Sequence, residues 1–117
     1  MSGLTAHVLD IMHGRPASFL RIDLAVQDGA AYRHLTTLHT NATGRTDAPL
    51  LDAADMAVGR YELLFHVGDY FAALGVSLPA PRFFDLVPVR FGIAAPSEHY
   101  HVPLLVAPWG YQAYRGS

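Results

Sequence analysis

Alternation of apolar and polar residues dominates this chain and predicts β-strands rather than helices. Apolar residues occupy every second position in 18–26 and again in 61–67, which gives each segment one side suited to a core. The segment 32–40 also alternates, and Asp28-Gly29 before it is a typical hairpin turn. We therefore predict that 18–26 and 32–40 pair as a hairpin.

Four more extended segments and one short helix complete the predicted elements. The extended segments are 4–12, 83–91, 99–107 and 109–115. Pro88 indicates that 83–91 is an edge or bulged strand. The segment 40–59 lacks regular alternation and is predicted to form loops or short strands. A helix is predicted from Asp69 as N-cap to Leu74, with Gly75 ending it. Seven or eight short strands with regular turns indicate an all-β sandwich with one short helix.

The segment 99–107 is apolar on both of its faces. One face carries Tyr100, Val102, Leu104 and Val106, and the other carries His99, His101, Pro103, Leu105 and Ala107. A sandwich strand needs only one apolar face for its core, so the second face must meet something else. The segment 4–12 behaves in the same way, and we predict that both strands line a subunit interface.

Composition narrows the class of protein. A length of 117 residues is predicted to form a single domain, residues 1–117, and 51% apolar residues supply a real core. The formal charge of −2 and the scattered arginines argue against nucleic acid and anionic lipid as partners. The chain has no lysine, which excludes Schiff-base chemistry, and no cysteine, which excludes disulfides and thiol nucleophiles.

The two ends of the chain bear on location and packing. The first ten residues lack the pattern of a secretory leader, and no apolar run reaches membrane-spanning length. The closing Arg-Gly-Ser differs from the peroxisomal Ser-Lys-Leu signal, so a cytoplasmic protein is expected. The segment 111–117 carries no polar, frayed tail, which indicates a packed terminus.

Histidines and one arginine are the candidates for chemistry. His99 and His101 lie on one strand face, roughly 7 Å apart, and His7 stands alone among apolar residues. An imidazole titrates near neutrality and can serve as acid or base, although an isolated histidine is more often structural. Arg45 lies in a short turn, where an arginine most often pairs with a neighbour such as Asp47.

A zinc site is an alternative interpretation of the same histidines. His99 and His101, together with His7 or His13, would supply three nitrogen ligands. Seven histidines in this length produce such spacings easily, and no HExxH frame supplies a base. A GxSxG motif and a phosphate-binding loop are also missing from the sequence. We predict neither a metal nor a cofactor.

Three parts of the chain resemble one family over the whole length. Residues 4–17 (LTAHVLDIMHGRPA), 44–47 (GRTD) and 99–117 (HYHVPLLVAPWGYQAYRGS) are similar to the transthyretin-related 5-hydroxyisourate hydrolases. The closing Tyr-Arg-Gly-Ser distinguishes these enzymes from transthyretin, the hormone carrier. The resemblance implies a transthyretin-like, eight-stranded β-sandwich with one short helix, assembled as a homotetramer that is a dimer of dimers.

The resemblance also implies a site at the dimer–dimer interface. Catalysis falls on His7, Arg45 and His101, which we call the polar trio. Substrate binding falls on His7, Arg45, Tyr114, Arg115, Gly116 and Ser117.

The implied reaction is ring opening of 5-hydroxyisourate. Water would break its N1–C6 amide to give 2-oxo-4-hydroxy-4-carboxy-5-ureidoimidazoline in urate catabolism. A metal-independent acid–base mechanism suffices, in which His7 or His101 activates water and the sequence leaves open which one. The planar cation of Arg45 suits an acyl-urea edge or an oxyanion.

A non-catalytic, transthyretin-like module for a small aromatic ligand is the alternative function. The polar trio favours the enzyme, because a carrier needs no such groups. The chain departs from residues common in the family at Ala107, Trp109, Gln112 and Ala113, which bears on pocket shape. His99 has no role that the resemblance assigns, and we expect it to be a surface residue. The histidines expected to be structural or solvated are His13, His34, His39 and His66.

Overall fold

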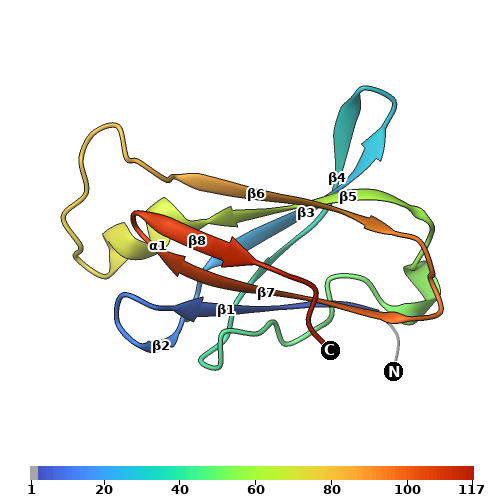
Figure 1. The fold of residues 1–117 in the computed structure, drawn as a ribbon, viewed down its shortest axis with the longest axis horizontal. Coiled ribbons are helices and arrows are strands. Elements are labelled where there is room, and N and C mark those ends of the chain that lie inside the picture. The colour runs from blue at the N-terminus through green and yellow to red at the C-terminus, as the bar shows by residue number, and fades with distance from the viewer. Residues whose placement is uncertain (1–2) are drawn as a thin grey trace.

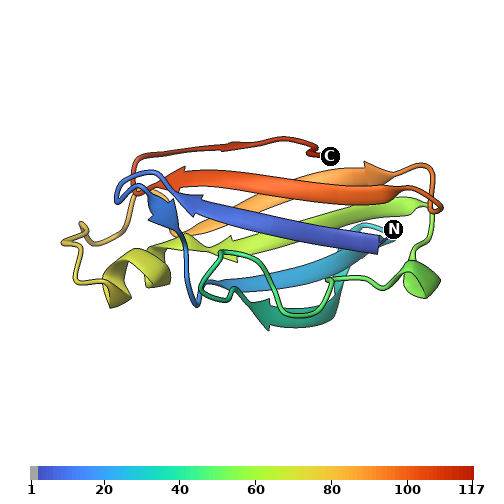
Figure 2. The same ribbon diagram turned by 90° about the horizontal axis from the view of Figure 1, so that it is seen from below.

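The computed structural model describes residues 3–117 and contains eight strands in two four-stranded sheets (Figure 1). The first sheet has the order β2 (Arg15–Pro16), β1 (Gly3–Asp10), β7 (His99–Ala107), β8 (Gly110–Ala113). The second has the order β4 (Ala31–His39), β3 (Arg21–Asp28), β5 (Gly59–His66), β6 (Leu86–Ile93). Figure 2 shows the sheets stacked face to face, with helix α1 (Val67–Ala73) at one end and the 3-10 helix η1 (Ala53–Asp55) at the other. The predicted all-β sandwich with one short helix is confirmed.

The alternating apolar residues fill the space between the two sheets. Both sheets contribute fully buried side chains, and removing them from water is the main stabilising contribution to such a fold. The principal ones are Leu4, Val8, Ile22, Leu24, Leu63, Phe65, Val87, Ile93, Leu104 and Val106.

Two details of the second sheet agree with the sequence pattern. β3 and β4 form the expected antiparallel hairpin, with Gly29 in the turn at φ +64°. β6 pairs only with β5 and is an edge strand, which explains how Pro88 is accommodated without a backbone N–H.

The first strand is shorter than predicted. β1 ends at Asp10, and Ile11 and Met12 are exposed in the turn that follows. The buried carboxylate of Asp10 accepts hydrogen bonds from the backbone N–H of His13 (2.9 Å) and from the hydroxyl of Tyr70 (2.8 Å). A side-chain acceptor of this kind satisfies the backbone of a turn, so the chain bends there instead of continuing as a strand.

The helix begins earlier than predicted, and Asp69 does not cap it. α1 starts at Val67, directly after β5, and its N-cap residue His66 makes no side-chain capping bond. Asp69 lies within the first turn, where its carboxylate accepts a hydrogen bond from Arg82 (2.7 Å). Val67 is fully buried, so packing against the core decides where the helix begins.

β1 and β7 lie side by side at the centre of the first sheet although they are distant in sequence. They pair in parallel, with Thr5 opposite His101 and His7 opposite Pro103. Because the intervening residues face the core, the side chains of Thr5, His7, His99 and His101 point outward. We call this surface of β1 and β7 the outer face.

Candidate active site

The outer face brings three histidines from two strands together. His7 comes from β1, and His99 and His101 come from the neighbouring β7. The rings of His99 and His101 are nearly parallel, with an interplanar angle of 16° and centroids 6.1 Å apart. The alternation read from the sequence therefore placed these two side chains correctly.

The segment 41–47 carries Arg45 to the edge of β1. The segment is closed on itself, since the backbone N–H of Asn41 donates to the carbonyl of Arg45 (2.6 Å) and Asn41 Oδ1 accepts from the Arg45 N–H (3.3 Å). It is tied to β1 because the N–H of Val8 donates to the carbonyl of Gly44 (2.8 Å). Arg45 is thus held one residue away from a fixed contact with β1.

Gly44 permits this close approach. Its φ of +78° lies in the left-handed region, which residues with a Cβ rarely adopt. A Cβ at this position would overlap the carbonyl oxygen of Val8 and would lie 3.2 Å from Pro16 Cβ and 3.3 Å from His7 Cδ2. Only glycine can adopt this backbone conformation without strain and also fit the space at this position.

His7 is held in one tautomer by this loop. Its Nε2 donates to the backbone carbonyl of Thr43 (2.9 Å), and because a carbonyl only accepts, the ring proton is on Nε2. Burial and the nearby cation of Arg45 lower the pKa of His7 from its ordinary value of 6.5, outweighing the opposing effect of the Thr43 hydrogen bond. Neutral His7 therefore has a lone pair on Nδ1 that can accept a proton.

The pKa of His101 is affected by burial and by the other candidate residues. Burial lowers the pKa of His101 from 6.5, and positive charge on His99, His7 and Arg45 lowers it further. Such charges act strongly only over short distances. His7 and His101 share one face of neighbouring strands, and Gly44, the residue before Arg45, lies against His7; the two histidines are half-buried and Arg45 is exposed.

Arg45 does not form the ion pair with Asp47 that we weighed from sequence. The Asp47 carboxylate accepts a hydrogen bond from the side-chain amide of Asn41 (2.9 Å). Within residues 3–117, Arg45 forms no salt bridge. Its guanidinium is available to an external partner.

The C-terminal residues return to the outer face at Gly116. The N–H of Gly116 donates to the carbonyl of His101 (2.8 Å), and Figure 2 shows this segment lying along the outside of β7. A Cβ on Gly116 would lie 2.9 Å from His101 Cδ2 and 3.0 Å from Pro103 Cγ. Glycine therefore allows the chain to pass directly beside the imidazole, and Ser117 follows at once.

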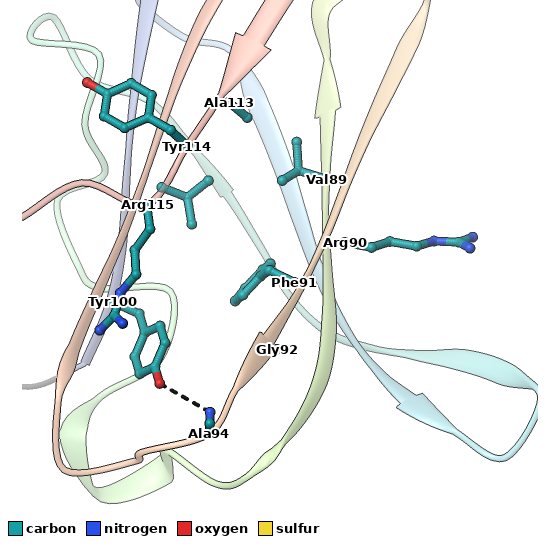
Figure 3. Close-up of a pocket in the computed structure, with 10 residues that line it drawn as sticks. Val89, Arg90, Phe91, Gly92, Ala94, Tyr100, Ala113, Tyr114 and Arg115 are labelled. Carbon is teal, nitrogen blue, oxygen red and sulfur yellow. Dashed lines mark hydrogen bonds between the residues drawn. The ribbon is translucent and has the colours of Figure 1, made fainter.

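Arg115 lines a cavity on the other side of β7. The cavity has a volume of about 400 Å³ and lies beside β6, with Val89 and Phe91 among its lining residues (Figure 3). The guanidinium of Arg115 lies 4.0 Å from the centroid of the Tyr100 ring and donates a hydrogen bond to Glu98 (3.1 Å). Tyr100 faces the core, so this cavity is separated from the polar trio by β7.

Tyr114 and Arg115 both line this cavity but differ in their contacts. Tyr114 also lines the cavity, although in Figure 3 its ring extends away from Phe91, and 52% of the residue is exposed. The four C-terminal residues predicted to bind substrate thus differ in their surroundings. Gly116 contacts His101, Tyr114 is exposed, Ser117 ends the chain, and Arg115 is engaged with Tyr100.

Two further histidines have structural partners. His13 contacts the carboxylate of Asp10 (2.6 Å), and His66 contacts that of Asp23 (2.8 Å). His13 is therefore occupied at the turn after β1 rather than beside His101. In the part of the chain that the structure describes, no three His, Asp or Glu side chains gather as a metal-binding group.

Sequence reasoning missed two residues that hold the histidines. Thr5 contacts His101 Nδ1 through its hydroxyl (2.7 Å), and Thr43 contacts His7 through its carbonyl. The strand alternation contained a signal for Thr5, because it lies two positions before His7 on the same strand face. Thr43 offered none, because any residue type supplies a carbonyl.

Helices within residues 3–117 are too short to span a membrane; none has the length and apolar character required.

Comparison with known proteins gives consistent results. A model of the HIUase/Transthyretin family matches residues 4–116. The 5-hydroxyisourate hydrolase 2 of Rhizobium meliloti is 57% identical over 114 residues, which cover 97% of this chain and 95% of that protein. The 5-hydroxyisourate hydrolase of Pseudomonas aeruginosa is 48% identical over 117 residues, covering 100% and 93%.

Solved structures share the fold. A Klebsiella pneumoniae 5-hydroxyisourate hydrolase matches with a TM-score of 0.82 and 36% identity, covering 100% of both chains. A crystal structure of (S)-allantoin synthase gives a TM-score of 0.91 and 42% identity, covering 99% of this chain and 44% of that one. Sea bream transthyretin in complex with thyroxine gives a TM-score of 0.85 and 25% identity, covering 97% and 93%.

Proposed function

The chain belongs to the HIUase/transthyretin family, and we propose that it hydrolyses 5-hydroxyisourate in urate catabolism, acting as one domain over residues 1–117. The reaction opens the N1–C6 amide and gives 2-oxo-4-hydroxy-4-carboxy-5-ureidoimidazoline. The observation that supports the proposal most is that His7 and His101 share the outer face while the loop that carries Arg45 is hydrogen-bonded to β1. A neutral imidazole with a free lone pair beside a permanent cation is suited to amide hydrolysis.

His7 is the proposed general base. Its Nε2 proton is committed to the carbonyl of Thr43, so Nδ1 takes a proton from water as the water oxygen attacks C6. The lowered pKa of His7 keeps the ring neutral and able to act at pH 7. The imidazolium then returns this proton to N1 as the C6–N1 bond breaks, which balances the step and regenerates the base.

Arg45 and His101 are the proposed electrophilic groups. Attack on C6 places negative charge on its oxygen, and a preorganised cation stabilises this charge more than it stabilises the neutral carbonyl. Arg45 is always protonated and its donors lie in one plane, which suits an oxyanion or the neighbouring urea edge. His101 faces the same space and supplies a second contact to the substrate.

The closing residues and a second subunit would complete the site. His7 and His101 are half-buried on an open face where Leu105 and Ala107 of β7 are also only partly covered, which supports the predicted homotetramer with sites at the dimer–dimer interface. Gly116 beside His101 supports substrate contacts by Gly116 and by Ser117, which follows it. A substrate contact by Tyr114, which lines the cavity beside β6, rests on the family resemblance. For Arg115, a substrate contact requires release from Tyr100. A cytoplasmic location stays a prediction.

Turnover of freshly made substrate tests the function. Urate oxidase generates 5-hydroxyisourate in place, and its ultraviolet absorbance is followed with and without the protein. We expect accelerated decay, and a loss on the order of 100- to 10,000-fold in His7→Ala, Arg45→Ala and His101→Ala. His34→Ala, at an exposed histidine of β4 in the second sheet, is the matched control and keeps full activity.

Three outcomes would contradict the proposal. Decay at the spontaneous rate with wild-type protein, accompanied by binding of an aromatic ligand, would favour the carrier alternative. A folded variant of the trio with normal turnover would remove that residue from the mechanism. Loss of activity with a chelator and its recovery with zinc would favour the His99 and His101 zinc alternative.

A further inference from the structure

One hydroxyl group lies between two imidazoles on the outer face. Thr5 Oγ1 is 2.7 Å from Nδ1 of His101 and 3.1 Å from Nε2 of His99. Thr5 is directly opposite His101 in the β1–β7 register, so the pairing of the strands fixes this contact. The mechanism proposed above uses neither Thr5 nor His99.

The second nitrogen of His99 determines where the protons lie. His99 Nδ1 is buried and has no hydrogen-bond partner in residues 3–117. A buried N–H without an acceptor is rarer in proteins than a buried acceptor without a donor, so Nδ1 carries the lone pair. The ring proton of neutral His99 is then on Nε2, from which it is donated to Thr5 Oγ1.

The direction of the Thr5 hydroxyl follows from this bond. Thr5 accepts from His99, so its single proton is free to be donated to Nδ1 of His101. The distances agree, because hydroxyl donors typically make the shorter contact and N–H donors the longer one.

Two other proton arrangements leave a donor unsatisfied. If His101 donated from Nδ1, Thr5 would donate to His99 Nε2, and the buried Nδ1 of His99 would become an N–H without an acceptor. If both rings donated to Thr5, its hydroxyl proton would have no acceptor among the hydrogen bonds of residues 3–117. Only the chain from His99 through Thr5 to His101 leaves neither the Thr5 hydroxyl nor the buried Nδ1 of His99 as a donor without an acceptor, and it places the remaining ring proton on Nε2 of His101.

We propose that Thr5 and His99 are positioning residues that hold His101 in the tautomer with its proton on Nε2. Nε2 forms no hydrogen bond in the described part of the chain, so it is the nitrogen left to meet the substrate. The consequence for catalysis rests on the proposed function. His7 accepts the proton of water, whereas His101 donates a hydrogen bond to an oxygen of 5-hydroxyisourate.

Loss of the Thr5 hydroxyl should therefore reduce the chemical step more than binding. Without it, His101 can move its proton to Nδ1 and present a lone pair to the substrate oxygen, which repels it. Removal of one such donor typically lowers kcat on the order of 100-fold. We expect this loss in Thr5→Val with little change in KM, because the side chain keeps its shape.

Conservative variants separate positioning from packing. Thr5→Ser keeps the hydroxyl and should restore kcat to near the wild-type value. His99→Gln keeps an N–H donor near the position of Nε2 and should retain activity, whereas His99→Leu should lose it. Thr36→Val, at a half-buried threonine of β4 in the second sheet, is the matched control and should be unaffected.

Proton–nitrogen NMR of the imidazole side chains reads the tautomer without substrate. In wild-type protein at pH 7.5 we expect the His101 proton on Nε2, and in Thr5→Val a mixture or a shift to Nδ1. The proposal is overturned if wild-type His101 has its proton on Nδ1, or if Thr5→Val keeps both kcat and the wild-type spectrum. If wild-type protein shows the tautomer but does not hydrolyse 5-hydroxyisourate, the proposed function fails while the positioning role of Thr5 and His99 stands.

Discussion

Replacement of Gly44 by alanine tests whether the loop at β1 positions the catalytic groups. Gly44 has a φ of +78°, and an added methyl group would overlap the carbonyl oxygen of Val8. Val8 belongs to the central pair of the first sheet, so its backbone cannot move easily. The loop must shift instead, and Thr43 and Arg45 on either side of Gly44 move with it.

The expected loss of unfolding free energy in Gly44→Ala has two parts. Left-handed backbone costs a residue with a Cβ roughly 1 to 2 kcal/mol. The shift also breaks the hydrogen bond from the Val8 N–H to Gly44 and that from His7 to Thr43, each worth about 1 kcal/mol net. We therefore expect Gly44→Ala to lower the free energy of unfolding by roughly 3 kcal/mol. Displacement of Arg45 by about 1 Å should reduce kcat/KM on the order of 100-fold.

Gly29 provides the matched control. It has a similar φ of +64°, and a Cβ there would have no other heavy atom within 4 Å. Gly29→Ala should therefore lower the free energy of unfolding only by the cost of the left-handed backbone, and it should keep full activity. Urea unfolding of both variants at one protein concentration, together with the 5-hydroxyisourate decay assay, measures the two parts separately.

Equal unfolding free energies for the two alanine variants would show that the overlap at Val8 has no consequence. Normal kcat/KM in Gly44→Ala would show that the position of Arg45 does not depend on this loop. Either result would refute the assignment of Gly44 as the residue that fixes the loop against β1.

Two further predictions concern ionisable groups. Arg45 helps to lower the pKa of His7, so Arg45→Gln should raise the pKa of His7 in an NMR titration; an unchanged value would place Arg45 away from the ring. Burial raises the pKa of Asp23, but hydrogen bonds led by Thr37 and His66 bring it down to about 2. Because the folded pKa is depressed, Asp23→Asn should cost about 2 kcal/mol in urea unfolding at pH 6, and the difference should shrink as pH falls from about 4 towards 2. A constant difference across this range would be inconsistent with that pKa.

Strand positions could be predicted from sequence because one face of each strand packs into the apolar core while the other face points outward. Alternation along β3, β5 and β7 places apolar side chains between the sheets, and the structure agrees at each of them. The ends were less predictable. Asp10 ends β1 through a contact with Tyr70, which lies 60 residues away in the chain, and no local pattern encodes such a partner.

Candidate members of the site could be proposed from the family resemblance, but their geometry could not. Parallel pairing of β1 with β7 sets His7 and His101 on one face, and this register depends on contacts across almost the entire chain. The loop that carries Arg45 is fixed to β1 by a backbone hydrogen bond of Gly44, and Arg115 turns toward Tyr100 on the other side of β7. Neither direction follows from residue type.

The two histidines of the polar trio show why residue type alone does not assign a role. His7 donates to a carbonyl, which accepts only, so its other nitrogen is a base. His101 contacts a hydroxyl, which can donate or accept, so its tautomer is decided one step further away, at the buried nitrogen of His99. The opposite functions proposed for these identical imidazoles thus come from their partners. A base and a hydrogen-bond donor on one face are what hydrolysis of an amide requires, and both depend on groups that never touch the substrate.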